Sequence, residues 1–209
     1  MKFLGFRKEK SIQKKGYNFI AGIDEVGRGA LAGPVCASAV FIKDFRDIKG
    51  FLRNINDSKK VSAEKRKELF SLITKSKSIE WGIGISSNKI IDKINILEAT
   101  KAAMRRALFS LNNKLKGEKI DYLILDGNFE IDAGILEEPV IKGDEKIFSC
   151  AAASILAKVY RDKIMVKFSR RYLNYGFDRN KGYGTDFHIR QIKKYGFSKI
   201  HRESFKISK

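Results

Sequence analysis

The sequence predicts an α/β fold in which a mixed β-sheet is flanked by helices and followed by a small C-terminal helical subdomain. Three observations carry this prediction. Three β-rich segments come early in the chain, helical and strand patterns then alternate, and the last segment repeats Lys, Tyr, Gly and His. Early strands followed by helix–strand alternation are typical of a sheet that helices cover.

The first three strands are predicted over residues 17–24, 34–42 and 80–86. The first two are apolar segments rich in β-forming residues, and they are separated by the glycine-rich turn Gly27-Arg28-Gly29. The third strand alternates apolar and polar residues in the period of a half-buried strand.

Two helices are predicted over residues 62–75 and 95–115. Ser62 can cap the first, whose apolar stripe consists of Leu69, Leu72 and Ile73. The apolar residues of the second recur at helical spacing and predict one buried face, made of Ile96, Leu97, Ala99, Ala103, Met104, Ala107, Leu108 and Leu111.

The second half of the chain continues the alternation. Residues 121–125 form a short apolar run that predicts a central strand covered on both faces, and a further strand is expected at 139–141. The helix expected over 148–168 opens with three alanines, which are small enough to let it pack closely on the sheet. Residues 177–205 are assigned to the helical subdomain.

The charge balance indicates a polyanionic partner. The chain has 43 Lys and Arg against 24 Asp and Glu, a net charge of +19. Such an excess attracts nucleic acid, although most single lysines simply face solvent. Basic residues concentrate in 1–15 and 193–209. We therefore divide the chain into a basic leader, 1–16, and one domain, 17–209, which includes the helical region from about 170.

Cys36 and Cys150 lie among small apolar residues and have no metal-binding spacing, so buried free thiols are expected. The sequence contains no secretory signal and no apolar run of membrane-spanning length. These features favour a cytoplasmic protein without a membrane partner, and we expect a monomer.

Several carboxylates stand beside glycines at predicted strand and helix ends. Asp24 and Glu25 close the first strand, Asp126 precedes Gly127, and Asp144 follows Gly143. Each has an ordinary structural explanation as a turn or a helix cap. Strand ends of one sheet can converge, however, and converging carboxylates would repel one another unless a cation neutralised them.

Such oxygen ligands suit Mg²⁺ or Mn²⁺. Two ions roughly 3.5–4 Å apart activate water and stabilise the leaving oxygen in phosphodiester hydrolysis. A basic protein with an acidic pocket is what a metal-dependent nuclease requires.

Seven ordered blocks of this sequence, spread over about residues 19–205, resemble bacterial ribonuclease HII. They are GIDEVGRG (22–29) continued by LAGP (31–34), DSKK (57–60), ILEAT (96–100), LDGN (125–128) with KGD (142–144), AAASILAKV (151–159) with Arg161-Asp162, KGYGT (181–185), and His201-Arg202.

The resemblance implies an RNase H-like fold and a site of four carboxylates, Asp24, Glu25, Asp126 and Asp144, holding two ions when substrate is bound. Asp24 is expected to bridge both ions. Two further elements would recognise the substrate. The Gly27-Arg28-Gly29 loop would read the ribonucleotide 2′-hydroxyl through its backbone, and Tyr183 would pack on the sugar at the RNA–DNA junction. Candidate phosphate contacts are Lys59, Ser154, Lys158 and Arg161.

The implied activity is endonucleolytic hydrolysis of the RNA strand of RNA–DNA hybrids and incision 5′ of single ribonucleotides in duplex DNA, giving 3′-hydroxyl and 5′-phosphate ends. The related ribonuclease HIII carries an extra N-terminal domain, for which a leader of about 16 residues is too short. A basic, non-catalytic RNA-binding protein would explain the charge but not the carboxylates. Another nuclease or recombinase of the same fold would not account for the Gly-Arg-Gly loop. His188 and His201 are expected to be structural.

Overall fold

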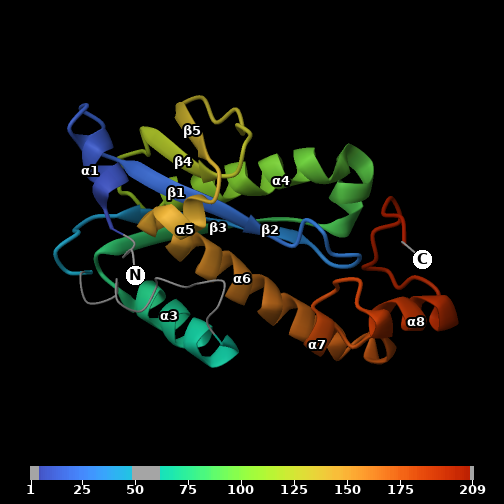
Figure 1. The fold of residues 1–209 in the computed structure, drawn as a ribbon. Coiled ribbons are helices and arrows are strands. Elements are labelled where there is room, and N and C mark those ends of the chain that lie inside the picture. The colour runs from blue at the N-terminus through green and yellow to red at the C-terminus, as the bar shows by residue number, and fades with distance from the viewer. Residues whose placement is uncertain (1–4, 49–61, 208–209) are drawn as a thin grey trace.

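A computed structural model describes residues 5–48 and 62–207 and shows a five-stranded sheet in the order β3-β2-β1-β4-β5 (Figure 1). Strands β1, β2 and β3 are antiparallel neighbours, whereas β4 and β5 run parallel to β1. The strands are β1 (Ile20–Val26), β2 (Val35–Ile42), β3 (Ile79–Ser86), β4 (Tyr122–Asp126) and β5 (Leu136–Val140).

Helices cover both faces of this sheet. Helix α4 packs on one face, and α6 packs on the other with α3 beside it (Figure 1). The mixed, helix-flanked sheet predicted from the sequence is confirmed. The helices are α1 (Arg7–Gln13), α3 (Ala63–Lys75), α4 (Asn88–Asn112), α5 (Gly143–Lys146), α6 (Phe148–Ser169), α7 (Phe177–Asn180) and α8 (Asp186–Tyr195), with a 3-10 turn, η1 (Leu173–Tyr175).

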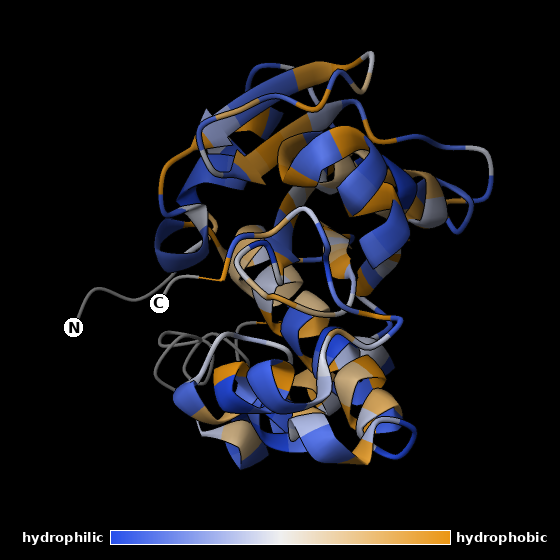
Figure 2. Ribbon diagram, turned by 90° about the vertical axis from the view of Figure 1, so that its right-hand side faces the viewer, coloured by the Kyte–Doolittle hydropathy of each residue, from blue (hydrophilic) through white to orange (hydrophobic). Residues whose placement is uncertain are grey.

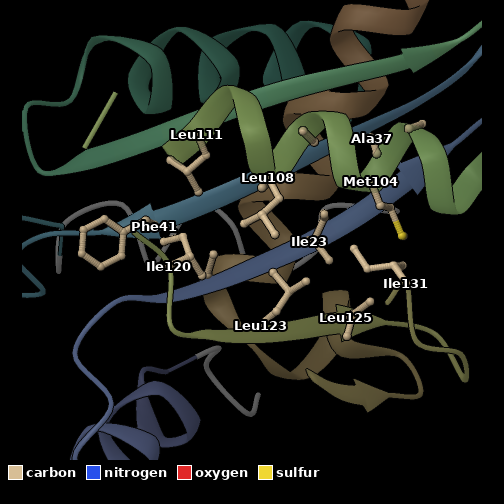
Figure 3. Packing of buried hydrophobic residues seen from close by; sticks show 14 of the residues in the cluster. Ile23, Ala37, Phe41, Met104, Leu108, Leu111, Ile120, Leu123, Leu125 and Ile131 are labelled. Carbon is tan, nitrogen blue, oxygen red and sulfur yellow. The ribbon is translucent and has the colours of Figure 1, made fainter. Parts of the chain in front are cut away.

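The core under α4 is built from alternate residues of the central strands. Ile23 of β1 and Leu123 and Leu125 of β4 point toward this face, where Met104 and Leu108 of α4 meet them (Figure 3). Because strand side chains alternate between faces, the even-numbered residues of β1 and β4 point toward α6.

Helix α6 lies very close to the sheet, as its alanines predict. Ala151, Ala152 and Ala153 are fully buried, and a Cβ placed on Gly22 of β1 would collide with the backbone at Ser149. A glycine in the strand and alanines in the helix thus bring the two backbones together. Cys150, in the same stretch of α6, is a buried free thiol, as is Cys36 on β2, and the prediction for both is confirmed.

The basic N-terminal segment folds onto the domain, which its charge pattern does not predict. Phe6, directly before α1, and Ile12, within α1, belong to two different buried hydrophobic clusters. Glu9 is only 1% exposed, and its Oε1 accepts hydrogen bonds from the backbone N–H and the hydroxyl of Ser149 at 3.2 and 2.9 Å. Glu9 therefore caps the beginning of α6, whose own N-cap residue, Ile147, makes no side-chain cap hydrogen bond.

The C-terminal region forms a small core of its own at the far end of α6 (Figure 1). Met165 of α6 packs there with Tyr175, Phe177 and Ile192. Figure 2 views the molecule from this side and shows hydrophobic and hydrophilic residues alternating along the helices, as expected for amphipathic elements. A bridge between Ala32 and His201 joins this region to the segment that follows β1.

The helix predicted over residues 95–115 corresponds to the second of two segments of α4; the first segment was not predicted, and the end was placed three residues too late. Helix α4 begins at Asn88, capped by Ser87, and ends at Asn112. It is broken at Asn95, whose φ of 68° is left-handed and whose Oδ1 accepts from the N–H of Leu97 and Glu98. Asn95 therefore caps the second segment, and Leu97 in its first turn is 38% exposed rather than buried.

The described residues include no helix long and apolar enough to cross a membrane.

Candidate active site

The ends of β1 and β4 bring Asp24 and Asp126 side by side. Ile23 pairs with Leu125 in the parallel ladder, so the next residue of each strand is an aspartate. Both are even-numbered positions of their strands, on the face that α6 covers. Asp24 is 6% exposed, and its Oδ1 accepts from the N–H of Glu25 at 2.6 Å.

A cavity of about 360 Å³ opens at these strand ends, between the sheet, α6 and α3. Three of the four predicted carboxylates contribute to its wall. The lining residues are Asp24, Glu25, Val26, Arg66, Asp126, Ser154, Ile155 and Lys158.

The carboxylates in the cavity repel one another. Burial raises the pKa of Asp24 well above its ordinary value, the negative charges of Glu25 and Asp126 raise it further, and a hydrogen bond from Ser154 opposes the shift. Burial also raises the pKa of Glu25, against the opposing charge of Arg28, whose Nη1 lies 3.3 Å from Glu25 Oε1. The site therefore favours a bound positive charge, which would relieve the repulsion.

Asp144 lies next to this group without lining the cavity. The N–H of Gly143 donates to Asp126 Oδ1 at 2.8 Å, which anchors the start of α5 on the end of β4. Asp144, the following residue, is 1% exposed. The structure thus places Asp24, Glu25 and Asp126 on the cavity, and Asp144 directly follows the glycine that is hydrogen-bonded to Asp126.

Arg202 holds the Gly27-Arg28-Gly29 loop by hydrogen bonds to its backbone carbonyls. The Arg202 guanidinium, fully buried, donates to the carbonyls of Gly27, Arg28 and Gly33 at 2.7, 2.8 and 3.0 Å. A peptide group is planar and trans, so its N–H points opposite to its C=O. With the carbonyls of Gly27 and Arg28 turned toward Arg202, the N–H groups of Arg28 and Gly29 point away from it. Gly27 has a φ of 94°, which favours glycine there.

Tyr183 stands over α6, beside the cavity. Its ring centroid lies 5.7 Å from Lys158 Nζ and 5.3 Å from the guanidinium carbon of Arg161. Lys158 lines the cavity and also pairs with Asp162, 3.1 Å away and one turn later. Tyr183 therefore lies close to Lys158, a residue of the cavity wall.

The phosphate contact expected of Arg161 does not fit the structure. Arg161 is fully buried, and its guanidinium donates to the carbonyls of Pro34, Lys181 and Ala32 at 2.8, 2.8 and 3.1 Å. It joins the segment after the glycine loop to the segment that carries Tyr183. Its place in the sequence, on a helix beside Lys158, did not distinguish this role from an exposed one.

Two other candidate phosphate contacts, Ser154 and Lys158, lie on the cavity wall, whereas Lys59 falls outside the described residues. Sequence reasoning missed Arg66, which reaches the cavity from α3. It also gave no role to Arg202, although His201-Arg202 is one of the family-like blocks. Both positions depend on how distant segments pack, which local patterns do not contain.

The cavity suits divalent cations by the chemistry of its donors. Oε2 of Glu25 is buried and has no hydrogen-bond partner in the described structure, so a carboxylate oxygen is left for a ligand. Over residues 5–48 and 62–207, no three or more carboxylate, histidine or thiol groups already close around one point. Mg²⁺ and Mn²⁺ would take carboxylate oxygens of this kind and complete their shell with water and phosphate.

The strand order and the acidic cavity at the ends of β1 and β4 fit the ribonuclease H class of fold that the sequence predicts. The family model for ribonuclease HII matches residues 21–208, and this chain belongs to that family. It is accordingly an endonuclease that acts on the RNA of RNA–DNA hybrids.

Relatives of known sequence and structure support this family assignment. The chain is 48% identical to ribonuclease HII of Caldanaerobacter subterraneus subsp. tengcongensis, over 94% of this chain and 78% of that protein. It is 51% identical to ribonuclease HII of Clostridioides difficile, over 91% of this chain and 71% of that protein. Ribonuclease H2 of Pyrococcus horikoshii OT3 is similar in structure, with a TM-score of 0.71 and 28% identity over 91% of this chain and 95% of that one.

A chain from the PCNA:RNase HII complex of Archaeoglobus fulgidus has a TM-score of 0.75 and 25% identity, over 92% of this chain and 97% of that one. Bst-RNase HIII, solved in complex with Mn²⁺, shares the fold with a TM-score of 0.69 at 19% identity, over 90% of this chain and 67% of that one.

Proposed function

We propose that this ribonuclease incises duplex DNA on the 5′ side of a single embedded ribonucleotide, in addition to cutting the RNA strand of hybrids, and leaves 3′-hydroxyl and 5′-phosphate ends. Such a cut would begin ribonucleotide excision repair. The observation that carries the proposal is the adjacency of three elements: the acidic cavity, the glycine loop and Tyr183.

The four carboxylates Asp24, Glu25, Asp126 and Asp144 would hold two divalent ions, Mg²⁺ or Mn²⁺, once the substrate phosphate is present. When bound, these ions supply an activated water and charge stabilisation for the leaving 3′-oxygen. Enzymes of the ribonuclease H family depend on divalent metal ions, and the mutual repulsion of Asp24, Glu25 and Asp126 supports the same dependence here.

The glycine loop and Tyr183 would select the sugar. Only the 2′-hydroxyl distinguishes RNA from DNA at a given nucleotide. The N–H groups of Arg28 and Gly29, turned outward by Arg202, are suited to donate to that hydroxyl. Tyr183 would pack on the sugar of the following nucleotide and favour deoxyribose there, because a 2′-hydroxyl would be crowded against the ring.

A basic groove offers a path for the rest of the duplex. It has a volume of about 670 Å³ and runs between α3 and α6, and Arg66 lines both this groove and the acidic cavity. Its charged lining is mainly cationic, which suits a phosphate backbone: Arg66, Lys67, Lys163, Lys167, Arg170 and Lys181, against Asp162 and Asp178. Lys158 and Ser154 would contact phosphates nearer the scissile bond, and Lys59 is proposed from the sequence alone.

We further propose that the enzyme works in the cytoplasm as a monomer, and its solution mass measured by light scattering tests the second point. A purely RNA-binding role is not favoured, because it gives the buried carboxylates no function.

The decisive experiment is cleavage of a DNA duplex carrying one ribonucleotide, with the cut mapped at nucleotide resolution. We expect one incision 5′ of the ribonucleotide, none in an all-DNA duplex, and a much larger loss of cleavage than of binding in Tyr183→Ala. Efficient cutting of single-stranded RNA without a response to the embedded ribonucleotide would overturn the substrate assignment and leave the acidic site standing.

A further inference from the structure

Two buried histidines form a continuous hydrogen-bonded chain that ends on the backbone of Tyr183. The backbone nitrogen and the hydroxyl oxygen of Ser198 both lie 2.8 Å from His201 Nδ1, and Nε2 of His201 lies 3.0 Å from Nε2 of His188. Nδ1 of His188 then lies 2.9 Å from the carbonyl oxygen of Tyr183. His188 and His201 are the two histidines of the sequence, and both take part in this series of hydrogen bonds.

The two ends of the chain fix the tautomer of each ring. A backbone N–H can only donate, so Nδ1 of His201 accepts and its proton resides on Nε2. A carbonyl can only accept, so Nδ1 of His188 carries the proton and Nε2 of His188 accepts from His201. Every donor therefore meets an acceptor, in one direction from Ser198 to Tyr183, provided that both rings are neutral.

The surroundings keep both rings neutral. His188 and His201 are 0% and 1% exposed. Phe197 stacks on His201 with centroids 5.1 Å apart, and Phe177 meets His188 edge-on at 5.3 Å. Tyr175, the ionisable neighbour from η1, directs its hydroxyl to the carbonyl of Gly196. Burial lowers the pKa of both histidines, for His201 to about 4.

The same segment also holds the glycine loop. His201 is followed by Arg202, which grips the carbonyls of Gly27 and Arg28. His201 thus reaches Tyr183 through His188, and the next residue, Arg202, contacts the glycine loop directly. Tyr183 and the glycine loop are the two elements assigned to sugar recognition. A change in the histidine chain would shift Tyr183 relative to the loop and to the carboxylates.

We propose that His188 and His201 are positioning residues that set the place of Tyr183 at the substrate sugar. This inference rests on the proposed role of Tyr183. The hydrogen-bonded histidine pair holds the Tyr183 carbonyl through Nδ1 of His188. The same carbonyl also accepts from the N–H of Thr185 at 2.8 Å, so two donors fix this peptide group. Neither histidine touches the reacting atoms.

The key variant is His188→Phe, which retains an aromatic ring but removes the donor to Tyr183. We expect the kcat for a duplex with one ribonucleotide to fall roughly 10- to 100-fold while KM changes less than about 3-fold, since small misplacements of a positioning group reduce turnover. His188→Asn places an amide N–H near the position of Nδ1 and should recover most of the loss. Tyr175→Phe is the matched control, because it removes one hydrogen bond from the same cluster outside the chain.

A double-mutant cycle separates positioning from general destabilisation. In a Tyr183→Ala background, His188→Phe should cost almost nothing more, because the group that it positions is gone. If His188→Phe retains full turnover, or if its loss is undiminished in that background, the inference fails while the proposed function stands. If Tyr183→Ala itself leaves junction cleavage unchanged, the proposed role of Tyr183 fails and the inference with it.

Nitrogen-15 NMR of the histidine rings provides a test that requires neither activity nor a variant. The wild-type protein should show His188 protonated on Nδ1 and His201 on Nε2 at pH 7. The same tautomer on both residues, or a charged ring on either, would contradict the chain.

Discussion

Two clusters of charged side chains lie near the glycine loop and Tyr183, and they differ in how their charges are balanced. At the ends of β1 and β4, Asp24, Glu25 and Asp126 face one another, and their like charges and burial raise the pKa of Asp24 and Glu25. Arg161 of α6 and Arg202 near the C-terminus are more deeply buried, but each donates to three backbone carbonyls.

The acidic cluster is therefore suited to ligand binding, and the basic cluster of arginines to holding loops rigidly. The acidic cluster is incomplete by itself and is suited to bind cations, whereas the basic cluster is satisfied internally and holds loops in place. Burial alone does not identify a functional group. The balance of donors, acceptors and charge around it does.

The largest expected effect is the loss of activity when a carboxylate of the acidic cluster is replaced. Asp126→Asn keeps the volume of the side chain and removes one ligand charge, so we expect kcat to fall at least about 1,000-fold with the fold unchanged. Turnover at saturating Mg²⁺, with circular dichroism to monitor folding, measures this. Asp132→Asn, at an exposed carboxylate outside the cavity, should retain wild-type turnover. Near-normal activity in Asp126→Asn would remove this residue from the site.

At the basic cluster, the main loss should be in stability. Arg161→Met leaves three buried carbonyls without their donor, and we expect the free energy of unfolding to fall by about 3–5 kcal/mol. Lys158→Met, one turn earlier on the same helix and partly exposed, should cost less than about 1 kcal/mol. Urea denaturation of both variants gives the comparison. Equal losses would mean that Arg161 is not the structural anchor that its contacts indicate.

The histidine pair should make stability depend on pH in a defined direction. His201 has a pKa of about 4 in the folded protein against 6.5 as the ordinary value, so below pH 6.5 the unfolded chain binds a proton that the folded chain does not. Its stabilising contribution is therefore lost as the pH falls from 6.5 toward 4, by about 2–3 kcal/mol.

The difference between wild type and His201→Phe isolates this contribution, because the carboxylates titrate in both proteins. Free energies of unfolding measured from pH 7.5 to 4.5 should converge as the pH falls. Parallel curves would show that His201 does not remain neutral in the folded state.

A smaller effect concerns substrate binding. If Lys158 contacts a phosphate, Lys158→Ala should reduce the slope of log K against log salt concentration by about one unit. Arg161→Met should leave the slope unchanged, since its guanidinium is fully buried. Fluorescence anisotropy with a non-cleavable duplex at several salt concentrations distinguishes the two. An unchanged slope for Lys158→Ala would assign Lys158 to its ion pair with Asp162 alone.

Most of the fold and the acidic positions could be predicted because the relevant signals are local. The alternating pattern of the strands, the Ser62 cap and the alanines of α6 each depend on residues that are only a few positions apart in the sequence. Asp24 and Asp126 could be placed together because each ends a strand of one sheet, and the family resemblance added Asp144.

The remaining features arise from packing between distant segments. Arg161 and Lys158 lie three residues apart on one helix, yet one is buried under Pro34 and Lys181 and the other lines a cavity. Their sequence neighbourhood does not separate these outcomes. Similarly, Arg66 reaches the cavity only because α3 packs against α6, and the break at Asn95 depends on one left-handed residue within an otherwise helical pattern.

The central claim is that the acidic cluster binds cations and that its carboxylates repel one another when no metal is bound. Thermal unfolding of the wild type and Asp24→Asn, with and without Mn²⁺, tests this claim most directly. Because burial and repulsion raise the pKa of Asp24, its ionised form reduces stability as the pH rises, and the asparagine removes that penalty. At pH 8 without metal, Asp24→Asn should melt at least as high as the wild type. With saturating Mn²⁺ the order should reverse, because only the wild type retains the full set of ligands. A wild type that melts higher without metal, or melting temperatures that Mn²⁺ leaves unchanged, would contradict the account.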